Sequence, residues 1–309
     1  MNNKQKIGII YGGNSPEHEV SKMTAQSIIQ NIDTAKFETI EIFIDHEDNF
    51  DSQLLENIDV AFLAVHGPNC EDGKLQQLLE DRKIKYTGPK VLASRINMDK
   101  ILMHDAFKEA GLNVVRYYGF DKNEKCSAIV ESAIANIGLP CFVKPNNAGS
   151  SIGVSKVENQ SDLINAINEA FKFDDKIIVE SAVKNPREIE VGILGNDELI
   201  ISEPGEILSD GKVYSYDTKY FQPFKTSIST NLNPEKINEI KNHAEKAYRS
   251  TACTGYSRID FLLDQNNKVY INEINTLPGF TKTSMFPNLM QNSGLKYKDL
   301  ITKIIELAQ

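Results

Sequence analysis

The sequence lacks the excess of positive charge that is typical of proteins that bind nucleic acids or anionic membranes. Its 309 residues carry a formal net charge of −9, and the pI is about 5.2. Both of those partners require a basic binding surface. The charge balance therefore argues against them as main partners, whereas a nucleotide needs only a locally positive pocket.

Cysteine motifs and long apolar runs are also missing. The apolar run near the N-terminus, Ile7 to Tyr11, is too short for a signal peptide or a membrane helix, and no later segment reaches membrane length. We therefore expect a cytoplasmic protein. The four cysteines have no C-x-x-C spacing and no histidine cluster, which predicts a reducing compartment and no structural zinc site: Cys70, Cys126, Cys141 and Cys253.

Two common nucleotide-binding motifs are absent as well. The pattern G-x-x-x-x-G-K-[ST] of P-loop proteins does not occur, and Gly12-Gly13 is not followed by the G-x-G-x-x-G pattern of dinucleotide-binding domains. We also find no internal repeat. A nucleotide site in this chain therefore needs another scaffold.

The length predicts two or three domains that share a cleft. The first 90 residues alternate strand and helix signals, which predicts a parallel sheet with helices on its faces. The remainder reads as two α+β units, so we predict domains over residues 1–90, 91–182 and 183–309. The segment Lys219–Pro234 has weak periodicity and many Ser, Thr and Asn residues, and is predicted to be a long loop of the kind that forms lids.

Hydrophobic periodicity and turn residues give the expected elements. Strands are predicted at Lys6–Tyr11, Phe37–Ile44, Val60–Val65, Val114–Gly119, Cys141–Val143, Ile177–Glu180, Glu188–Leu194, Leu199–Ser202, Tyr256–Leu263 and Val269–Ile274. Helices are predicted at Glu17–Ile32, Asp99–Ala110, Ser127–Ile137, Lys236–Ser250 and Tyr297–Ala308.

Four polar residues near the C-terminus form the sharpest signal. The turn-like segment Asp264–Lys268 separates two strand-like runs, so these runs should form an antiparallel hairpin. If the turn centres between its two asparagines, paired residues have numbers that sum to 533. Asp260 then faces Glu273, Arg258 faces Asn275, and all four side chains project from one side of the hairpin.

Such an arrangement favours metal binding. Two directly opposed carboxylates repel each other unless a counter-charge lies nearby. Two acids and an amide are oxygen ligands that Mg²⁺ takes, usually together with phosphate oxygens. A solvated polar hairpin face is the alternative, but the flanking Arg258 and the Pro-Gly loop that follows favour a metal site at Asp260, Glu273 and Asn275.

Other segments supply groups that suit phosphate or substrate binding. The run from Lys144 to Gly153 offers small residues, free amides and a lysine that can fold over phosphates, although a plain connecting turn would look the same. Lys100 opens a helix and alone would be a surface residue. His66 ends a buried strand, where open sheets place ligands, although structural roles are commoner there. Glu17 begins a helix, and helix capping is its alternative role.

Together these motifs resemble the D-alanine–D-alanine ligase family of the ATP-grasp superfamily. They occur in the family's order over nearly the whole chain, and in combination they are highly specific. The matching segments are Gly12-Gly13-x-Ser-x-Glu17-x-Glu-Val-Ser21, His66-Gly-Pro-x-x-Glu-Asp-Gly73, Met98-Asp-Lys100, Val143-Lys-Pro through Gly-Ser-Ser-Ile-Gly153, Arg187-Glu-Ile-Glu-Val191, Tyr216-Asp-Thr-Lys-Tyr220, Arg258-Ile-Asp260, and Asn272-Glu-Ile-Asn-Thr-Leu-Pro-Gly279 through Ser284.

The resemblance implies an ATP-grasp fold, with an N-terminal doubly wound parallel-sheet domain and two further α+β domains that sandwich ATP. It implies two Mg²⁺ ions, with Mn²⁺ as an alternative, at Asp260, Glu273 and Asn275. It also implies a homodimer. By matching position, ATP binding falls to Lys100, Lys144, Ser151, Glu180, Val183 and Glu188.

The implied reaction joins two D-alanine molecules for peptidoglycan precursor synthesis. One D-alanine carboxylate attacks the γ-phosphate of ATP, and the second D-alanine amine displaces phosphate from the resulting acyl phosphate. Catalysis needs cationic clamps and N–H donors at the developing charges. The resemblance assigns catalytic roles to Glu17, Ser150, Tyr220, Arg258 and Gly279, and substrate binding to His66, Lys219 and Ser284.

Three functions remain open at this point: D-alanine–D-alanine ligation, ligation of D-alanine to D-serine or another partner, and a non-catalytic nucleotide-binding role. The resemblance implies an amino acid as second substrate, because relatives that make D-alanyl-D-lactate lack the tyrosine at Tyr220. A hydroxyl is rejected poorly by such a pocket, which keeps D-serine open. The chain departs from the family at Asn69-Cys70, where many members carry an aromatic-glycine pair, and in a short segment before Val60.

Overall fold

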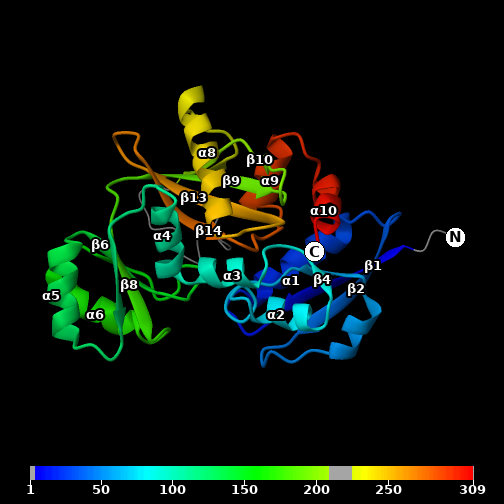
Figure 1. Ribbon diagram of the computed structural model, residues 1–309, viewed down its shortest axis with the longest axis horizontal. Coiled ribbons are helices and arrows are strands. Elements are labelled where there is room, and N and C mark those ends of the chain that lie inside the picture. The colour runs from blue at the N-terminus through cyan, green and yellow to red at the C-terminus, as the bar shows by residue number, and fades with distance from the viewer. Residues whose placement is uncertain (1–3, 209–224, 309) are drawn as a thin grey trace.

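Three separate β-sheets organise the chain. The computed structural model describes residues 4–208 and 225–308. Figure 1 places the first sheet and the second toward opposite ends of the long axis, with the third sheet above them. This mixed architecture confirms the expected fold class of one parallel sheet and two antiparallel α+β units.

The first sheet is parallel throughout, with the strand order β2-β1-β3-β4. Its central strand is rich in isoleucine because a strand in a covered parallel sheet is buried on both faces. Ile7, Ile9 and Ile10 are fully buried. The elements are β1 (Gln5–Gly12), α1 (His18–Asn31), β2 (Phe37–Ile44), the 3₁₀ helix η1 (Ser52–Asn57), β3 (Val60–Leu63), α2 (Lys74–Asp81) and β4 (Lys85–Tyr86).

The second sheet is antiparallel, with the order β5-β8-β6-β7, and two helices cover it. Its core is a cluster of its own that includes Phe120, Ile167 and Val179. The elements are β5 (Tyr117–Asp121), α5 (Cys126–Asn136), β6 (Cys141–Pro145), β7 (Ser155–Val157), α6 (Gln160–Ala170) and β8 (Lys176–Ser181).

The third sheet follows the order β12-β11-β9-β13-β14, with β10 paired to β9. Its inner face carries alternating apolar residues of β9 such as Ile189, Val191 and Ile193, while Glu188 and Glu190, which alternate with them, line the cleft. The elements are β9 (Arg187–Leu194), β10 (Ile200–Ile201), β11 (Gly205–Leu208), β12 (Lys225–Ser227), α8 (Pro234–Ser250), β13 (Tyr256–Leu263), β14 (Val269–Asn275), α9 (Met285–Asn292) and α10 (Tyr297–Glu306).

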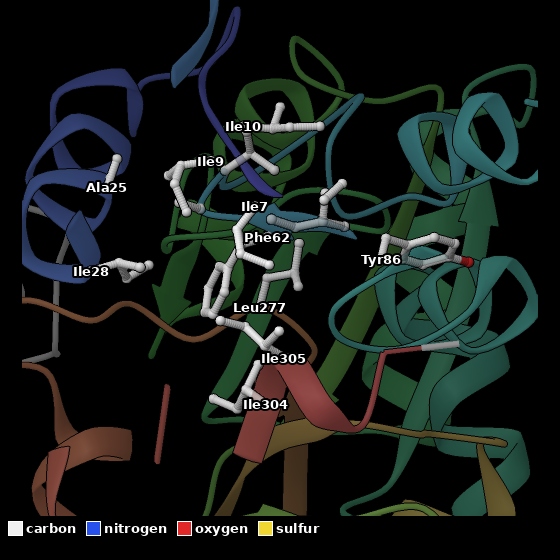
Figure 2. Packing of buried hydrophobic residues seen from close by; sticks show 14 of the residues in the cluster. Ile7, Ile9, Ile10, Ala25, Ile28, Phe62, Tyr86, Leu277, Ile304 and Ile305 are labelled. Carbon is white, nitrogen blue, oxygen red and sulfur yellow. The ribbon is translucent and has the colours of Figure 1, made fainter. Parts of the chain in front are cut away.

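Hydrophobic cores cross the predicted domain boundaries. Helices α3 (Val91–Met98) and α4 (Lys100–Glu109) precede the second sheet but pack into the core of the third. The core of the first sheet includes Leu277 and residues Ile304 and Ile305 of α10, which Figure 2 shows beside Phe62. Boundaries at residues 90 and 182 do separate the three sheets. That these sheets are separate domains stays a prediction.

The structure corrects two of the expected elements. The segment predicted as a loop over Lys219–Pro234 contains the strand β12, which pairs with β11. The strand predicted at Val114–Gly119 begins at Tyr117 instead, because its partner β8 ends one residue beyond Glu180, to which Tyr117 pairs. Within the described ranges no helix is long and apolar enough to cross a membrane.

Candidate active site

Two adjoining cavities lie where the three sheets meet. The smaller, of about 120 Å³, lies between the end of the first sheet, the loop 146–153 and the segment that follows β14. The larger, of about 530 Å³, lies between the second and third sheets. They share a wall formed by Lys100, Glu273 and the Ala148–Ser150 part of the loop.

The predicted site residues divide between these cavities. The smaller cavity is lined by Glu17, His66, Lys100, Ser150, Arg258, Glu273, Asn275, Gly279 and Ser284. The larger is lined by Lys100, Lys144, Ser150, Ser151, Glu180, Val183, Glu188, Asp260 and Glu273. The remaining two, Lys219 and Tyr220, lie outside the described residues.

The β13–β14 hairpin forms the floor between the cavities, and its pairing matches the sequence argument. Arg258 pairs with Asn275, and Asp260 pairs with Glu273. Ile259 and Ile274 are buried on the opposite face. The four polar side chains therefore project together into the cleft, as predicted.

A β-bulge in the hairpin explains why that register holds at the site. Close to the turn, Leu263 pairs with Val269 and Phe261 with Ile271, so the turn lies half a residue earlier than predicted. The register shifts between Asp260 and Phe261, and Asn272 becomes the extra residue of the bulge. The bulge restores the pairing that the sequence argument required, and both Asn272 and Glu273 then line the larger cavity.

A third carboxylate extends the polar row to β9. Asp260 pairs with Glu190 on one side and with Glu273 on the other, so three acids lie side by side across three strands. Arg258 supplies counter-charge: its Nε and Nη2 contact the two oxygens of Asp260 at 2.7 Å each, and Nε lies 3.3 Å from Glu190. Arg258 lines the smaller cavity, whereas Asp260 lines the larger.

Lysines 144 and 100 bring positive charge to the shared wall. Lys144 Nζ lies 2.6 Å from Glu180, and Lys100 donates to the carbonyl of Ala148. Burial alone would lower the pKa of Lys144, but the Glu180 carboxylate raises it above its ordinary value. Burial lowers the pKa of Lys100, against the opposing attraction of Glu273. Both lysines line the larger cavity.

Glu180 is held from two sides within the interior. Its second oxygen lies 2.9 Å from Nε2 of His104 on α4. Burial would raise the pKa of Glu180, but Lys144 and His104 together hold it below its usual range. The carboxylate is therefore ionised and fixed at the edge of the larger cavity, where Val183 and Glu188 also line the wall.

The loop 146–153 has a constrained backbone. Ser150 and Ser151 both have left-handed conformations, with φ of 52° and 60°, although neither is glycine. Gly153 has φ of 67°, and a Cβ there would lie 2.6 Å from the ring of Phe173. At the other end, Asp174 accepts the backbone N–H of Asn147. A strained loop fixed at both ends is typical of a ligand clamp.

The first sheet contributes Glu17 and His66 to the smaller cavity. Glu17 lies immediately before α1 and is buried, but its side chain makes no capping bond to the helix. His66 Nδ1 lies 3.0 Å from the Leu277 carbonyl and Nε2 lies 3.2 Å from Thr24 Oγ1. Burial lowers the pKa of His66, and the Glu17 carboxylate opposes that effect. The neutral ring thus joins the first sheet to the loop after β14.

The loop after β14 carries Gly279 and Ser284. A Cβ on Gly279 would lie 3.0 Å from Ser284 Oγ, so glycine leaves room beside the hydroxyl. Ser284 Oγ accepts the backbone N–H of Thr281 and lies 2.9 Å from Thr281 Oγ1. The amide of Gly279 and the hydroxyl of Ser284 are thereby positioned at one end of the smaller cavity.

Sequence reasoning missed two acids and one histidine at or next to the site. Glu71 lines the smaller cavity and accepts the Gly67 N–H at 2.8 Å; burial and the Glu17 charge raise its pKa well above the usual range. Glu190 could have been found from the alternation that begins at Glu188. His104 could have been found from its spacing of four residues from Lys100, because both then share a helix face.

The departure at Asn69-Cys70 is accommodated locally. Asn69, not Cys70, takes the left-handed conformation, with φ of 66°, which asparagine tolerates better than most residues. The Cys70 thiol is buried, and burial raises its pKa, so it is unreactive.

Among the residues in the described ranges, no group of three His, Cys, Asp or Glu side chains is arranged to hold a metal. The predicted metal site has only two acids, with an amide as its third ligand, so it falls outside that pattern. Asp260 and Glu273 are directly opposed and Asn275 shares their face, a donor set that fits a hard divalent cation.

Two family models together match most of the chain. The family model for the D-ala D-ala ligase C-terminus matches residues 106–306, and the model for the D-ala D-ala ligase N-terminus matches residues 6–56 and 48–89. The two N-terminal pieces meet in the short connection between β2 and β3.

Curated relatives that match nearly the whole chain are named D-alanine–D-alanine ligases. A D-alanine–D-alanine ligase of Geobacillus thermodenitrificans is 40% identical over 99% of this chain and 95% of its own length. A D-alanine–D-alanine ligase of Clostridium novyi is 40% identical over 99% of this chain and 98% of its own.

Solved structures give the same result for the fold. The VanG D-Ala:D-Ser ligase of Enterococcus faecalis superposes with a TM-score of 0.90 at 31% identity, over 99% of both chains. The D-alanine–D-alanine ligase of Coxiella burnetii superposes with a TM-score of 0.88 at 30% identity, over 98% of this chain and 93% of its own. The family expected from the motifs is therefore confirmed: this chain belongs to the D-alanine–D-alanine ligase family.

Proposed function

We propose that this protein joins two D-alanine molecules in a reaction driven by ATP, releasing ADP and phosphate. The observation that carries the proposal is the wall that the two cavities share. Lys100, Ser150 and Glu273 line both, so a phosphoryl group bound in the larger cavity meets an acid bound in the smaller. The dipeptide would supply peptidoglycan precursor synthesis in the cytoplasm.

ATP occupies the larger cavity in this proposal. Adenine lies near Glu180 and the backbone of Val183, the ribose near Glu188, and the phosphates near Lys100, Lys144 and Ser151. A volume of about 530 Å³ suits a nucleotide. Lysine charges and loop amides neutralise the phosphoryl group as it is transferred.

Asp260, Glu273 and Asn275 would hold Mg²⁺, with two ions expected and Mn²⁺ as an alternative. The cation would neutralise phosphate oxygens during transfer. Arg258, which engages both oxygens of Asp260 and lines the smaller cavity, would present its guanidinium to the substrates bound there.

The first substrate binds in the smaller cavity, with its ammonium at Glu17 and its carboxylate near His66. One carboxylate oxygen attacks the γ-phosphorus of ATP, the bond to the ADP oxygen breaks, and an acyl phosphate forms. Glu17 is buried and lines the smaller cavity, which supports this assignment.

The second substrate binds with its carboxylate at Lys219 and Ser284. Its amine attacks the acyl carbon, and phosphate leaves with the oxygen that came from the first carboxylate. Arg258 and the Gly279 amide stabilise the oxyanion of the tetrahedral intermediate. Tyr220, with Ser150 and Glu17, closes the site against water, which would hydrolyse the acyl phosphate.

Ligation of D-alanine to D-serine is the second candidate function. The resemblance to the VanG D-Ala:D-Ser ligase, with a TM-score of 0.90, favours its consideration. The two products differ by one hydroxyl, which a small pocket discriminates poorly.

Phosphate release from Mg-ATP, with products identified by mass spectrometry, separates these functions. The substrates compared are D-alanine alone and D-alanine with D-serine, D-lactate or L-alanine. We expect D-alanyl-D-alanine as the main product. A mixed D-Ala–D-Ser product in excess would favour the second function, and ATP binding without any turnover would contradict both.

We further propose that the protein is a homodimer. Gel filtration with light scattering at micromolar concentration should give twice the mass of one 34.6 kDa chain. A monomer mass under those conditions would contradict this assignment.

A further inference from the structure

Helix α4 carries two side chains at or behind the wall of the larger cavity. Lys100 begins the helix, and His104 follows one turn later. Residues four apart lie on the same helix face. Lys100 lines both cavities, whereas His104 lies behind the cavity wall and contacts Glu180.

His104, Glu180 and Lys144 form a buried chain of contacts. His104 Nε2 lies 2.9 Å from one oxygen of Glu180, and Lys144 Nζ lies 2.6 Å from the other. The side chains of His104, Glu180 and Lys144 are 1%, 5% and 15% exposed. Lys144 is therefore the most exposed of the three side chains, and His104 is the most buried.

The surroundings of the imidazole fix its tautomer. Nδ1 of His104 is buried and finds no hydrogen-bond partner among the described residues. The ring packs against Tyr117, with centroids 4.9 Å apart, and against Phe107. A proton on Nδ1 would lack an acceptor in this apolar setting, which is costly. The proton therefore lies on Nε2, which donates it to Glu180.

We propose that His104 is a positioning residue for ATP, a role that rests on the proposed function of this cavity. It anchors one oxygen of Glu180, so that the other oxygen holds Lys144 at the phosphate end of the cavity. A lysine side chain is flexible and loses considerable rotamer freedom when fixed. Because His104 holds the carboxylate, the entropy of Lys144 is lost when the protein folds and not when ATP binds.

The same contact predicts a coupling between nucleobase and phosphate recognition. Glu180 lies where adenine is proposed to bind, and its partner Lys144 lies where phosphates are proposed to bind. Loss of His104 leaves Glu180 with one partner and lets the Glu180–Lys144 pair rotate together. Affinity for ATP should fall, while binding of D-alanine in the other cavity should not change.

Three variants test this role. H104L removes the donor, H104Q keeps an N–H donor where Nε2 lies, and H243Q makes the same change on α8 as a control. Binding of ADP and of ATP is measured by calorimetry with Mg²⁺, and the KM for ATP, the KM for D-alanine and kcat are measured by phosphate release.

We expect H104L to weaken nucleotide binding and raise the KM for ATP about tenfold. The KM for D-alanine should stay within about twofold, and H104Q should recover most of the loss. A purely structural role predicts instead a lower melting temperature for H104L with unchanged nucleotide affinity of the folded fraction, which would overturn the proposal. Because calorimetry needs no turnover, a failure of the ligase function alone would leave this result intact.

Histidine ¹⁵N spectra provide a second test on the unmodified protein. The signal that disappears in H104Q should be that of a neutral ring protonated at Nε2. A ring protonated at Nδ1, or at both nitrogens, would overturn the assignment even if H104L fails to fold.

Discussion

Replacing Leu277 by alanine should lower both the stability and the catalytic activity, whereas the same change at Leu79 should lower only the stability. Both side chains are buried in the core of the first sheet, at 2% and 0% exposure. Leu277 belongs to the loop after β14 that leads to Gly279, and Figure 2 shows it beside Phe62. Leu79 lies on α2 and does not line either cavity.

The expected loss of stability is similar at the two positions. Removing three methylene-sized groups from a core costs about 2.4 kcal/mol in transfer free energy, at ~0.8 kcal/mol each. A residual cavity raises the total toward about 5 kcal/mol. Leu277 packs tightly against Gly88, since a Cβ on that glycine would lie 2.8 Å from it, so little collapse is expected. We expect about 3–5 kcal/mol for Leu277→Ala and about 2–5 kcal/mol for Leu79→Ala.

The activities should differ. The backbone carbonyl of Leu277 accepts from His66 Nδ1 at 3.0 Å, so a shift of this loop moves His66 and the Gly279 amide together. Displacements near 1 Å can cost about a hundredfold in rate. Leu277→Ala should therefore lower kcat/KM for D-alanine at least about tenfold per folded molecule.

Urea denaturation gives the free energy of unfolding, and phosphate release gives the activity of the folded fraction. Leu79→Ala should keep activity within about twofold of the parent protein. Equal activity of the two variants per folded molecule would refute the reasoning that Leu277 anchors the catalytic loop.

Three further predictions follow from the site. Gly153→Ala should cost about 2–4 kcal/mol in the free energy of unfolding, because the position has φ of 67° and a Cβ would lie 2.6 Å from Phe173; an unchanged urea midpoint would contradict this. Glu180→Gln should destabilise the protein by about 3 kcal/mol near neutral pH. Since the folded state holds the pKa of Glu180 below its usual 4.5, the stabilisation by the ionised form is present above that pH and is lost as the pH falls; a difference between the two proteins that persists unchanged down to about pH 3 would be inconsistent with the depressed pKa. Asp260→Asn should weaken Mn²⁺ binding in the presence of ADP at least about tenfold by electron paramagnetic resonance, whereas Asp299→Asn on α10 should not; equal Mn²⁺ affinity of the two variants would remove Asp260 from the metal site.

The sequence predicted the parts of the site that depend on short-range geometry. Turn residues and strand alternation were enough to pair Asp260 with Glu273, because a hairpin closes locally. The turn itself lies half a residue from the predicted centre, and the bulge at Asn272 compensates. Bulges depend on packing against neighbouring strands, which no local pattern reveals.

Contacts between distant segments were beyond the sequence pattern. The sequence assigned Glu180 to ATP binding, but its contacts with His104 and Lys144 join three elements that are far apart in the chain. Leu277 and Ile304 lie in the core of the first sheet although both follow the third. Hydrophobic periodicity identifies a buried face but not its partner, so these contacts required the structure.

Transfer of oxygen from D-alanine to phosphate would show whether the reaction passes through an acyl phosphate. The protein is incubated with Mg-ATP and D-alanine labelled with ¹⁸O in its carboxylate, and the phosphate is analysed by mass spectrometry. We expect one ¹⁸O atom in the phosphate for each dipeptide formed, because the attacking carboxylate oxygen leaves with phosphorus. Unlabelled phosphate accompanying dipeptide, or label in AMP, would contradict an acyl phosphate formed across the shared wall of the two cavities.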